Sequence, residues 1–367
     1  MTGAPLGERE RIAWLRLARA EAVGPVTFAH LIGRYGSAAR ALEALPELAR
    51  RGGRAQSLRV PSLAEAQGEL AAGAALGARL IGASEPGFPR LLAVLDPPPP
   101  LIWALGDGAL LARRAVAIVG ARVASAAGRR FAKTLAGALG EAGYGVVSGM
   151  ARGIDSAAHE GALATGTIAV LAGGVDDIYP PDNAPLHAAI KARGCLVSER
   201  AIGHAARAAD FPRRNRLISG IALGVVVVEA ELKSGSLITA RLAGEQGREV
   251  FAVPGSPLDP RARGANDLLR QGAILVEGAE DVLRVLDAQP TAAERDPAPY
   301  ETAGLEADPE TDALRAALEV LLSPTPTAFD ELARGAGAPA SAVLAALTEL
   351  ALAGRVELLA GGLAVKV

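Results

Sequence analysis

Short apolar segments alternate with segments of helical periodicity between residues 113 and 288, and this alternation limits the possible folds more than any other feature. Runs such as Val225–Val228 are apolar on both faces, which is typical of strands in a buried parallel sheet. Repeated strand–helix units with right-handed crossovers build a doubly wound sheet. The sequence therefore predicts an α/β domain of Rossmann-like type with a mostly parallel sheet. Strands are expected at 115–119, 145–148, 167–171, 194–198, 223–229, 249–253 and 273–276, and helices at 125–142, 153–164, 183–193, 213–220, 236–247, 264–271 and 279–287.

Smaller units flank this domain. Residues 1–75 have helical spacing, and Gly24-Pro25 between apolar residues fits either a helix-hairpin-helix or SAM-like domain or an ordinary helical bundle. The Rossmann-like domain is assigned to 76–290, and its Pro-rich first part, 76–112, is predicted to be an irregular lead-in. Residues 291–312 hold seven acidic residues against one arginine and are predicted to be a solvated linker. Residues 313–367 fit three helices and a hairpin, which is a winged-helix domain.

Composition and charge limit the partners and the cellular compartment that the sequence fits. The net charge is −2 over 367 residues, so affinity for a polyanion must come from a local basic patch. Cys195 is the single cysteine and cannot form an internal disulfide, which suits a reducing cytoplasm. The charged residues Glu8–Arg11 do not fit a signal peptide, and no apolar stretch has the length of a membrane span. We therefore expect a cytoplasmic protein that does not bind a membrane.

Polar residues follow the predicted strands where helices begin. An open α/β sheet binds its ligands at the carboxyl ends of the strands, and helix N-termini attract phosphate. Arginine offers a bidentate fork to phosphate, and glycine lets a ligand approach the backbone. Three arginines in four residues at a helix start would repel the positive end of the helix dipole, so an anionic partner is favoured there. The predicted binding residues are Arg122, Ser125, Gly149, Arg152, Gly153, Arg213, Arg214, Asn215, Arg216, Ser234, Gly235 and Ser236.

Several of these features have an ordinary structural alternative. Ser125 suits a helix N-cap whatever binds there, and Asp155 either caps its helix or orients Arg152. His159 has no metal-ligand partner nearby and is predicted to be structural. The sequence has no G-x-x-x-x-G-K-[ST] motif, no G-x-G-x-x-G before a helix, no metal cluster and no nucleophile–base pair. The prediction is phosphate binding without catalysis, a metal or a cofactor.

The motifs AIVGAR, VVSGMARGID, FPRRNRLISG, SGSLITA and GREVFAVPG, in this order, resemble the DNA processing protein A family (DprA, also called Smf) over about residues 80–285. The resemblance implies a homodimer that binds single-stranded DNA, protects incoming strands and brings RecA recombinase to them during natural transformation. The family's DNA-pocket residues map to Arg122, Ser125, Gly149, Arg152, Gly153 and the Arg213–Arg216 segment. The sequence departs from the family at Ala121 and Ala265, and Pro181-Asp182 stand where many members carry a lysine.

A single-stranded DNA-binding recombination mediator is therefore the predicted function, with a nucleotide phosphoribohydrolase of the lysine-decarboxylase-like type as the alternative. Those enzymes pair a similar Ser-Gly turn with a Pro-Gly-Gly-x-Gly-Thr loop and a catalytic glutamate. Here Glu229 is followed by Ser234-Gly235-Ser236, which is not that loop. The last helix, 341–353, carries Glu349 and no Lys or Arg, so the winged helix is not expected to be the main DNA reader. A protein-contact or regulatory role is favoured for it.

Overall fold

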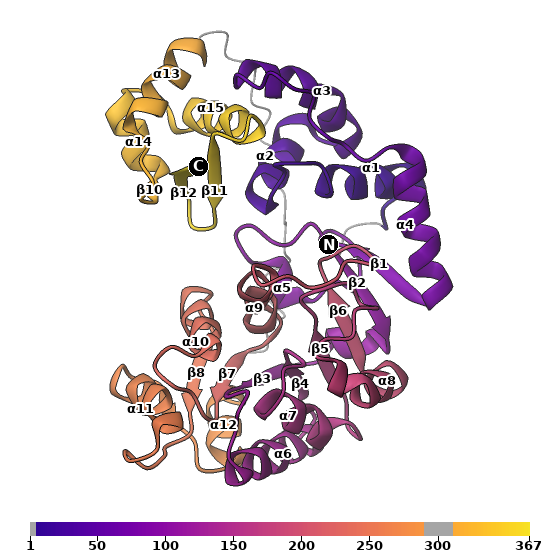
Figure 1. Ribbon diagram of the computed structural model, residues 1–367, viewed down its shortest axis with the longest axis vertical. Coiled ribbons are helices and arrows are strands. Elements are labelled where there is room, and N and C mark those ends of the chain that lie inside the picture. The colour runs from indigo at the N-terminus through magenta and orange to yellow at the C-terminus, as the bar shows by residue number, and fades with distance from the viewer. Residues whose placement is uncertain (1–4, 290–310) are drawn as a thin grey trace.

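The computed structural model describes residues 5–289 and 311–367. Its centre is a nine-stranded sheet with the strand order β1-β2-β6-β5-β4-β3-β7-β8-β9 (Figure 1). All neighbours from β6 to β9 pair in parallel, whereas β1–β2 and β2–β6 are antiparallel. The predicted mostly parallel sheet is thus confirmed. The strands are β1 (Ala78–Gly82), β2 (Leu101–Gly106), β3 (Ala115–Val119), β4 (Gly145–Ser148), β5 (Thr167–Val170), β6 (Cys195–Ser198), β7 (Gly224–Val227), β8 (Glu249–Ala252) and β9 (Ile274–Leu275).

Helices cover both faces of the sheet, because alternate strand residues point to opposite sides. Val116 and Ile118 of β3 lie in one buried cluster with Leu135 and Ile154, while Ala117 lies in the other cluster. A doubly wound core is therefore confirmed. The helices are α5 (Arg90–Ala93), α6 (Ala126–Glu141), α7 (Ile154–Ala162), α8 (Ala184–Arg193), α9 (Asp210–Ile221), α10 (Gly235–Glu245), α11 (Arg263–Arg270) and α12 (Ala279–Leu286), with 3₁₀ turns at Gly108–Ala112, Pro181–Asn183 and Pro260–Ala262.

The prediction of an irregular lead-in over 76–112 is wrong in part. Residues Ala78–Gly82 and Leu101–Gly106 are the strands β1 and β2, and β2 extends the sheet by pairing with β6. Prolines 97–100 lie in the turn between these strands, where they break no ladder hydrogen bond. The buried indole of Trp103 packs on the helix that contains Gly73. A Cβ at Gly73 would lie 2.3 Å from the indole, so the contact depends on this glycine.

The N-terminal unit is a four-helix domain, as predicted for residues 1–75. Pro25 begins α2, and Gly36 ends it in the left-handed conformation at φ 74°. Ser62 and Glu65 form a capping box at the start of α4. The helices are α1 (Glu8–Ala18), α2 (Pro25–Tyr35), α3 (Ala38–Arg51) and α4 (Leu63–Leu76).

The C-terminal unit is the predicted winged helix. Three helices pack beside a small sheet of order β10-β12-β11, whose hairpin turns at Gly361 and Gly362. Its elements are α13 (Thr311–Leu321), β10 (Thr327–Ala328), α14 (Phe329–Ala336), α15 (Ala340–Leu352), β11 (Val356–Leu359) and β12 (Leu363–Lys366). The predicted linker 291–312 lies outside the described residues except for its last two, which begin α13. In the described parts of the chain no single helix is long and apolar enough to cross a membrane, and α14 with α15 passes that test only as a pair bent by 106°.

Candidate functional site

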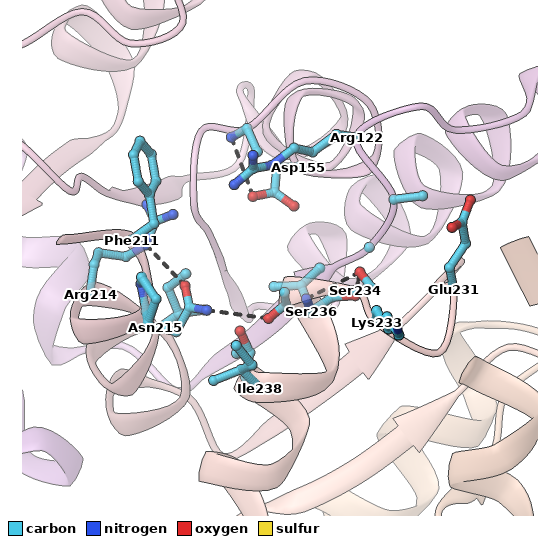
Figure 2. A pocket seen from close by; sticks show the side chains of 18 of the residues that line it. Arg122, Asp155, Phe211, Arg214, Asn215, Glu231, Lys233, Ser234, Ser236 and Ile238 are labelled. Carbon is cyan, nitrogen blue, oxygen red and sulfur yellow. Dashed lines mark hydrogen bonds between the residues drawn. The ribbon is translucent and has the colours of Figure 1, made fainter. Parts of the chain in front are cut away.

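A cleft of about 710 Å³ opens at the carboxyl ends of β3, β4 and β7 (Figure 2). The chain runs from β3 to β4 on one side and later returns to pair β7 on the other side of β3. The loops that follow these strands therefore diverge and leave a crevice, which is where open α/β sheets bind ligands. The cleft is lined by the loop after β3, by α9 and the segment before it, and by the loop between β7 and α10.

One rim of the cleft is cationic and aromatic. The guanidinium carbon of Arg122 lies 5.6 Å from the centroid of the Phe211 ring, and Tyr179 lies beside Phe211 at a centroid distance of 5.2 Å. Arg122 is exposed, and none of the carboxylates in the described residues forms an ion pair with it. Tyr179 is half exposed. This rim therefore offers a free positive charge next to two aromatic faces.

The opposite rim is the N-terminus of α10. The Ser234 Oγ accepts a hydrogen bond from the Ser236 backbone N–H at 3.3 Å and lies 2.7 Å from the Ser236 Oγ. A Cβ at Gly235 would meet nothing within 4 Å, so the backbone is open to a ligand there. Exposed Lys233 also lines the cleft. Lys233 was absent from the predicted site, although a lysine immediately before a helix start was a visible signal.

The arginines of α9 do not form one cluster, because residues adjacent along a helix point about 100° apart. Arg214 is buried beneath the cleft, where its Nη1 donates to the Gly149 carbonyl at 2.7 Å and to the Val170 carbonyl. Arg216 instead binds the Glu199 carboxylate at 2.5 Å, away from the cleft. Arg213 is exposed, and its Nη2 lies 3.7 Å from the Glu357 carboxylate of the winged helix. Asn215 faces the cleft and donates to the Gly235 carbonyl at 3.3 Å.

A buried carboxylate organises the loop between β4 and α7. Asp155 accepts hydrogen bonds from the Gly149 and Ala151 backbone N–H groups at 3.1 and 3.3 Å. Burial raises the pKa of Asp155 to about 6, and the nearby Arg214 charge opposes that rise. Burial also lowers the pKa of Arg214 to about 10, so Arg214 stays charged at neutral pH. Asp155 does not orient Arg152, because Arg152 pairs with Asp182 at 2.7 Å on the surface.

The two glycines of this loop are needed by the protein itself. A Cβ at Gly149 would lie 2.9 Å from the Arg214 guanidinium. Gly153 has a φ of +80°, and a Cβ there would lie 2.3 Å from the Ala121 carbonyl oxygen. Both positions therefore let protein segments pack closely, rather than leaving space for a ligand.

The N-terminus of α6 is already occupied. Ser125 caps this helix by accepting a hydrogen bond from the Gly128 N–H at 2.8 Å. The Ser125 N–H and Oγ both donate to the Glu229 carboxylate, at 2.9 and 2.5 Å. The protein's own carboxylate therefore takes the place of an anion at the N-terminus of α6, whereas the N-terminus of α10 lines the cleft with no carboxylate of the described residues bound to it.

Two further groups are structural. His159 is buried, and its Nδ1 lies 2.7 Å from the Thr167 hydroxyl. Burial lowers the pKa of His159 to about 3, and His159 does not line the cleft, which agrees with the predicted structural role. The buried thiol of Cys195 has its pKa raised to about 12. No group of three or more His, Cys, Asp or Glu residues that could hold a metal ion is found within residues 5–289 and 311–367.

The cleft thus brings together half of the residues predicted from the sequence. Ser125, Gly149 and Gly153 support the loops around it, Arg152 pairs on the surface, and Arg213 and Arg216 line a second cavity on the other side of α9. The predicted residues that line the cleft are Arg122, Arg214, Asn215, Ser234, Gly235 and Ser236.

An open, doubly wound sheet with a cleft at its switch point defines a Rossmann-like protein of the kind that binds ligands at this edge. The cleft is lined by three cationic side chains and two carboxylates, which are Arg122, Arg214, Lys233, Asp155 and Glu231. The family described as "DNA recombination-mediator protein A" matches residues 79–287, the DprA-like N-terminal HHH domain matches 8–72, and the DprA winged helix domain matches 301–362. The chain belongs to the DNA processing protein A family (DprA, or Smf). The match to the HHH domain favours the helix-hairpin-helix or SAM-like alternative for the N-terminal helices over an ordinary helical bundle.

Relatives and solved structures agree with this assignment. Protein Smf of Escherichia coli (strain K12) is 40% identical over 287 residues, covering 75% of this chain and 73% of that protein. DNA processing protein DprA of Bacillus subtilis (strain 168) is 42% identical over 213 residues, covering 57% and 72%. The X-ray structure of DprA from Streptococcus pneumoniae has a TM-score of 0.61 at 30% identity, covering 76% of this chain and 98% of that one. A Helicobacter pylori DprA structure, titled for its single-stranded DNA binding mode, has a TM-score of 0.53 at 30% identity, covering 57% and 95%.

Proposed function

We propose that this chain binds single-stranded DNA in the cleft and acts as a recombination mediator without catalysing a reaction. The observation that carries the proposal is the open cleft itself, which has Arg122, without an ion pair to any described carboxylate, on one rim and the N-terminus of α10 beside Lys233 on the other. Both features suit phosphate. The Helicobacter pylori relative, which is 30% identical, is described as binding single-stranded DNA.

Different groups in the cleft would contact the phosphates and the bases of the DNA. Phosphates would lie between Arg122, Lys233 and the N–H groups of α10, and bases would stack on the exposed faces of Tyr179 and Phe211. Contacts to phosphates carry no sequence information, so sequence preference should be weak. Duplex DNA keeps its bases stacked inside the helix and cannot use this aromatic pair.

Family membership supports a proposal about the partners. We infer that the protein coats incoming single strands during natural transformation, protects them, and brings RecA recombinase to them. A titration that compares single-stranded and duplex oligonucleotides of equal length tests the proposal. We expect clear preference for the single strand, and equal affinity for both would contradict the proposed site.

No hydrolysis of nucleoside monophosphates is expected. The Glu229 carboxylate is held by the N–H and Oγ of Ser125, and a Cβ at Gly128 would lie 2.6 Å from it, so Glu229 is packed into the start of α6. Chromatography of nucleotides incubated with the protein should therefore show no free base. Release of base by the wild type that disappears in Glu229→Ala would instead favour the phosphoribohydrolase.

The protein is expected to be a homodimer in solution. Family membership supports this expectation. The edge strand β9 has only two residues and offers little backbone to pair, but its Leu275 side chain is 46% exposed and is an apolar surface that a partner would cover. Light scattering on the full chain at micromolar concentration should give twice the monomer mass, and Leu275→Lys should shift the mass toward the monomer. A monomeric wild type would rule the dimer out.

A further inference from the structure

The third helix of the winged-helix domain is not available to DNA. In winged helices this element enters the major groove. Here α15 packs along α3 and α2 of the N-terminal domain (Figure 1). Thr348 and Glu349 are each only 1% exposed, although both are polar, and Leu352 is fully buried in the core that contains Phe28 and Leu31. The chain therefore covers its own recognition surface.

The fit between α3 and α15 depends on a missing side chain. A Cβ at Gly52 would lie 2.0 Å from the Glu349 carbonyl oxygen and 3.0 Å from the Ala353 Cβ. The φ of Gly52 is −67°, a conformation that every residue adopts easily. Gly52 is thus required by the close contact between the two domains and not by the local backbone.

Polar bonds set the register of this contact. The Thr348 Oγ1 lies 2.7 Å from the His30 Nδ1, and the Arg54 Nη1 donates to the Leu352 carbonyl at 3.2 Å. Glu349 pairs with Arg315 of its own domain and faces the Arg51 Nη1 of α3 at 3.9 Å. Burial lowers the pKa of His30 to about 4, so this ring is neutral at neutral pH. The His30 Nε2 and the Glu349 Oε1 are buried without a hydrogen-bond partner, so this polar network is only partly satisfied, and the contact between α3 and α15 rests mainly on the packing around Gly52.

The other end of the winged helix reaches α9. A second cavity of about 720 Å³ lies between the three domains and is lined by Arg213, Arg216 and the wing residues Val356–Leu358. The Glu357 carboxylate lies 3.7 Å from the Arg213 Nη2, with both side chains more than half exposed. Such an exposed pair binds weakly, so the packing of α15, and not Glu357, holds the wing in place.

We propose that the N-terminal domain and the winged helix form an intramolecular clamp that places Glu357 in front of Arg213 and thereby weakens single-stranded DNA binding. This inference rests on the proposed function. Arg214 lines both cavities, so a strand that leaves the cleft over α9 meets Arg213 next. A carboxylate at that point repels phosphate. Release of α15 removes the carboxylate and adds one phosphate contact.

Four variants of the full chain test the clamp. Gly52→Leu breaks the contact, and Gly68→Leu is its matched control, since a Cβ at exposed Gly68 in α4 meets nothing within 4 Å. Glu357→Gln removes the charge without disturbing α15, and Gly52→Leu combined with Arg213→Ala removes the gained contact. Small-angle scattering measures opening, and fluorescence anisotropy with labelled oligo-dT at several salt concentrations measures affinity.

Gly52→Leu should increase the radius of gyration and bind oligo-dT roughly three- to tenfold more tightly, with a salt slope steeper by about 0.7. Glu357→Gln should gain affinity with unchanged scattering, while Gly68→Leu and the double variant should not gain. If wild type binds and neither Gly52→Leu nor Glu357→Gln binds more tightly, the clamp is overturned and the proposed function stands. If no form binds, both are overturned. If Gly52→Leu does not fold by circular dichroism, Glu357→Gln decides alone.

Discussion

Replacing Arg122 with glutamate is expected to weaken single-stranded DNA binding by about tenfold or more, corresponding to at least about 1.4 kcal/mol. Arg122 stands on the cleft rim without a carboxylate partner among the described residues, so its charge is free for phosphate. Loss of one phosphate contact should also flatten the log–log salt dependence by roughly 0.7. Anisotropy titrations with oligo-dT across a range of salt concentrations measure both quantities.

Two variants control for the change of charge in Arg122→Glu. Arg193→Glu makes the same substitution at an exposed position of α8 that lines neither cavity, and it should leave affinity nearly unchanged. Arg122→Lys keeps the charge and should recover part of the affinity, since lysine lacks the planar fork of arginine. If Arg122→Glu binds with wild-type affinity and wild-type salt slope, the cleft is not the DNA site.

Much of the fold could be predicted because local patterns and tertiary structure agree in the central domain. The strands β3 to β7 are buried at every position, and their apolar runs are visible in the sequence. β1 and β2 were missed because the prolines between them were given more weight than the short apolar runs at Ala78–Gly82 and Leu101–Gly106. β2 joins the sheet through β6, which lies about ninety residues further on, and no local pattern indicates that pairing.

The site could be predicted less completely, because residue type does not say which way a side chain points. Arg213, Arg214 and Arg216 look like one basic cluster in the sequence, yet they enter three different environments around α9. The Ser125–Glu229 contact joins residues 104 positions apart, so no spacing argument could show that the N-terminus of α6 is closed. The burial of α15 depends in the same way on the distant Gly52.

Asp155→Ala is expected to destabilise the protein by about 3 kcal/mol or more, because it leaves the Gly149 and Ala151 N–H groups without their acceptor. The electrostatic attraction of Arg214 is not the main contribution, since burial raises the pKa of Asp155 despite that neighbour. Asp155→Asn keeps an acceptor oxygen and should cost much less. Urea unfolding followed by circular dichroism gives the free energies. Asp182→Ala, which breaks only the exposed pair with Arg152, should cost under about 1 kcal/mol.

The pH dependence tests whether burial or the attraction of neighbouring groups decides the pKa of Asp155. The folded-state pKa of about 6 lies above the usual 3.8, so the folded protein binds a proton that the unfolded chain has released between those values. The stability contributed by Asp155 is therefore greatest below about pH 4 and falls as the pH rises toward 6. Relative to Asp155→Asn, which cannot ionise, the wild type should lose stability across this window. An increase over the same window would mean that the attraction of Arg214 and of the two N–H groups for the ionised carboxylate outweighs the cost of its burial.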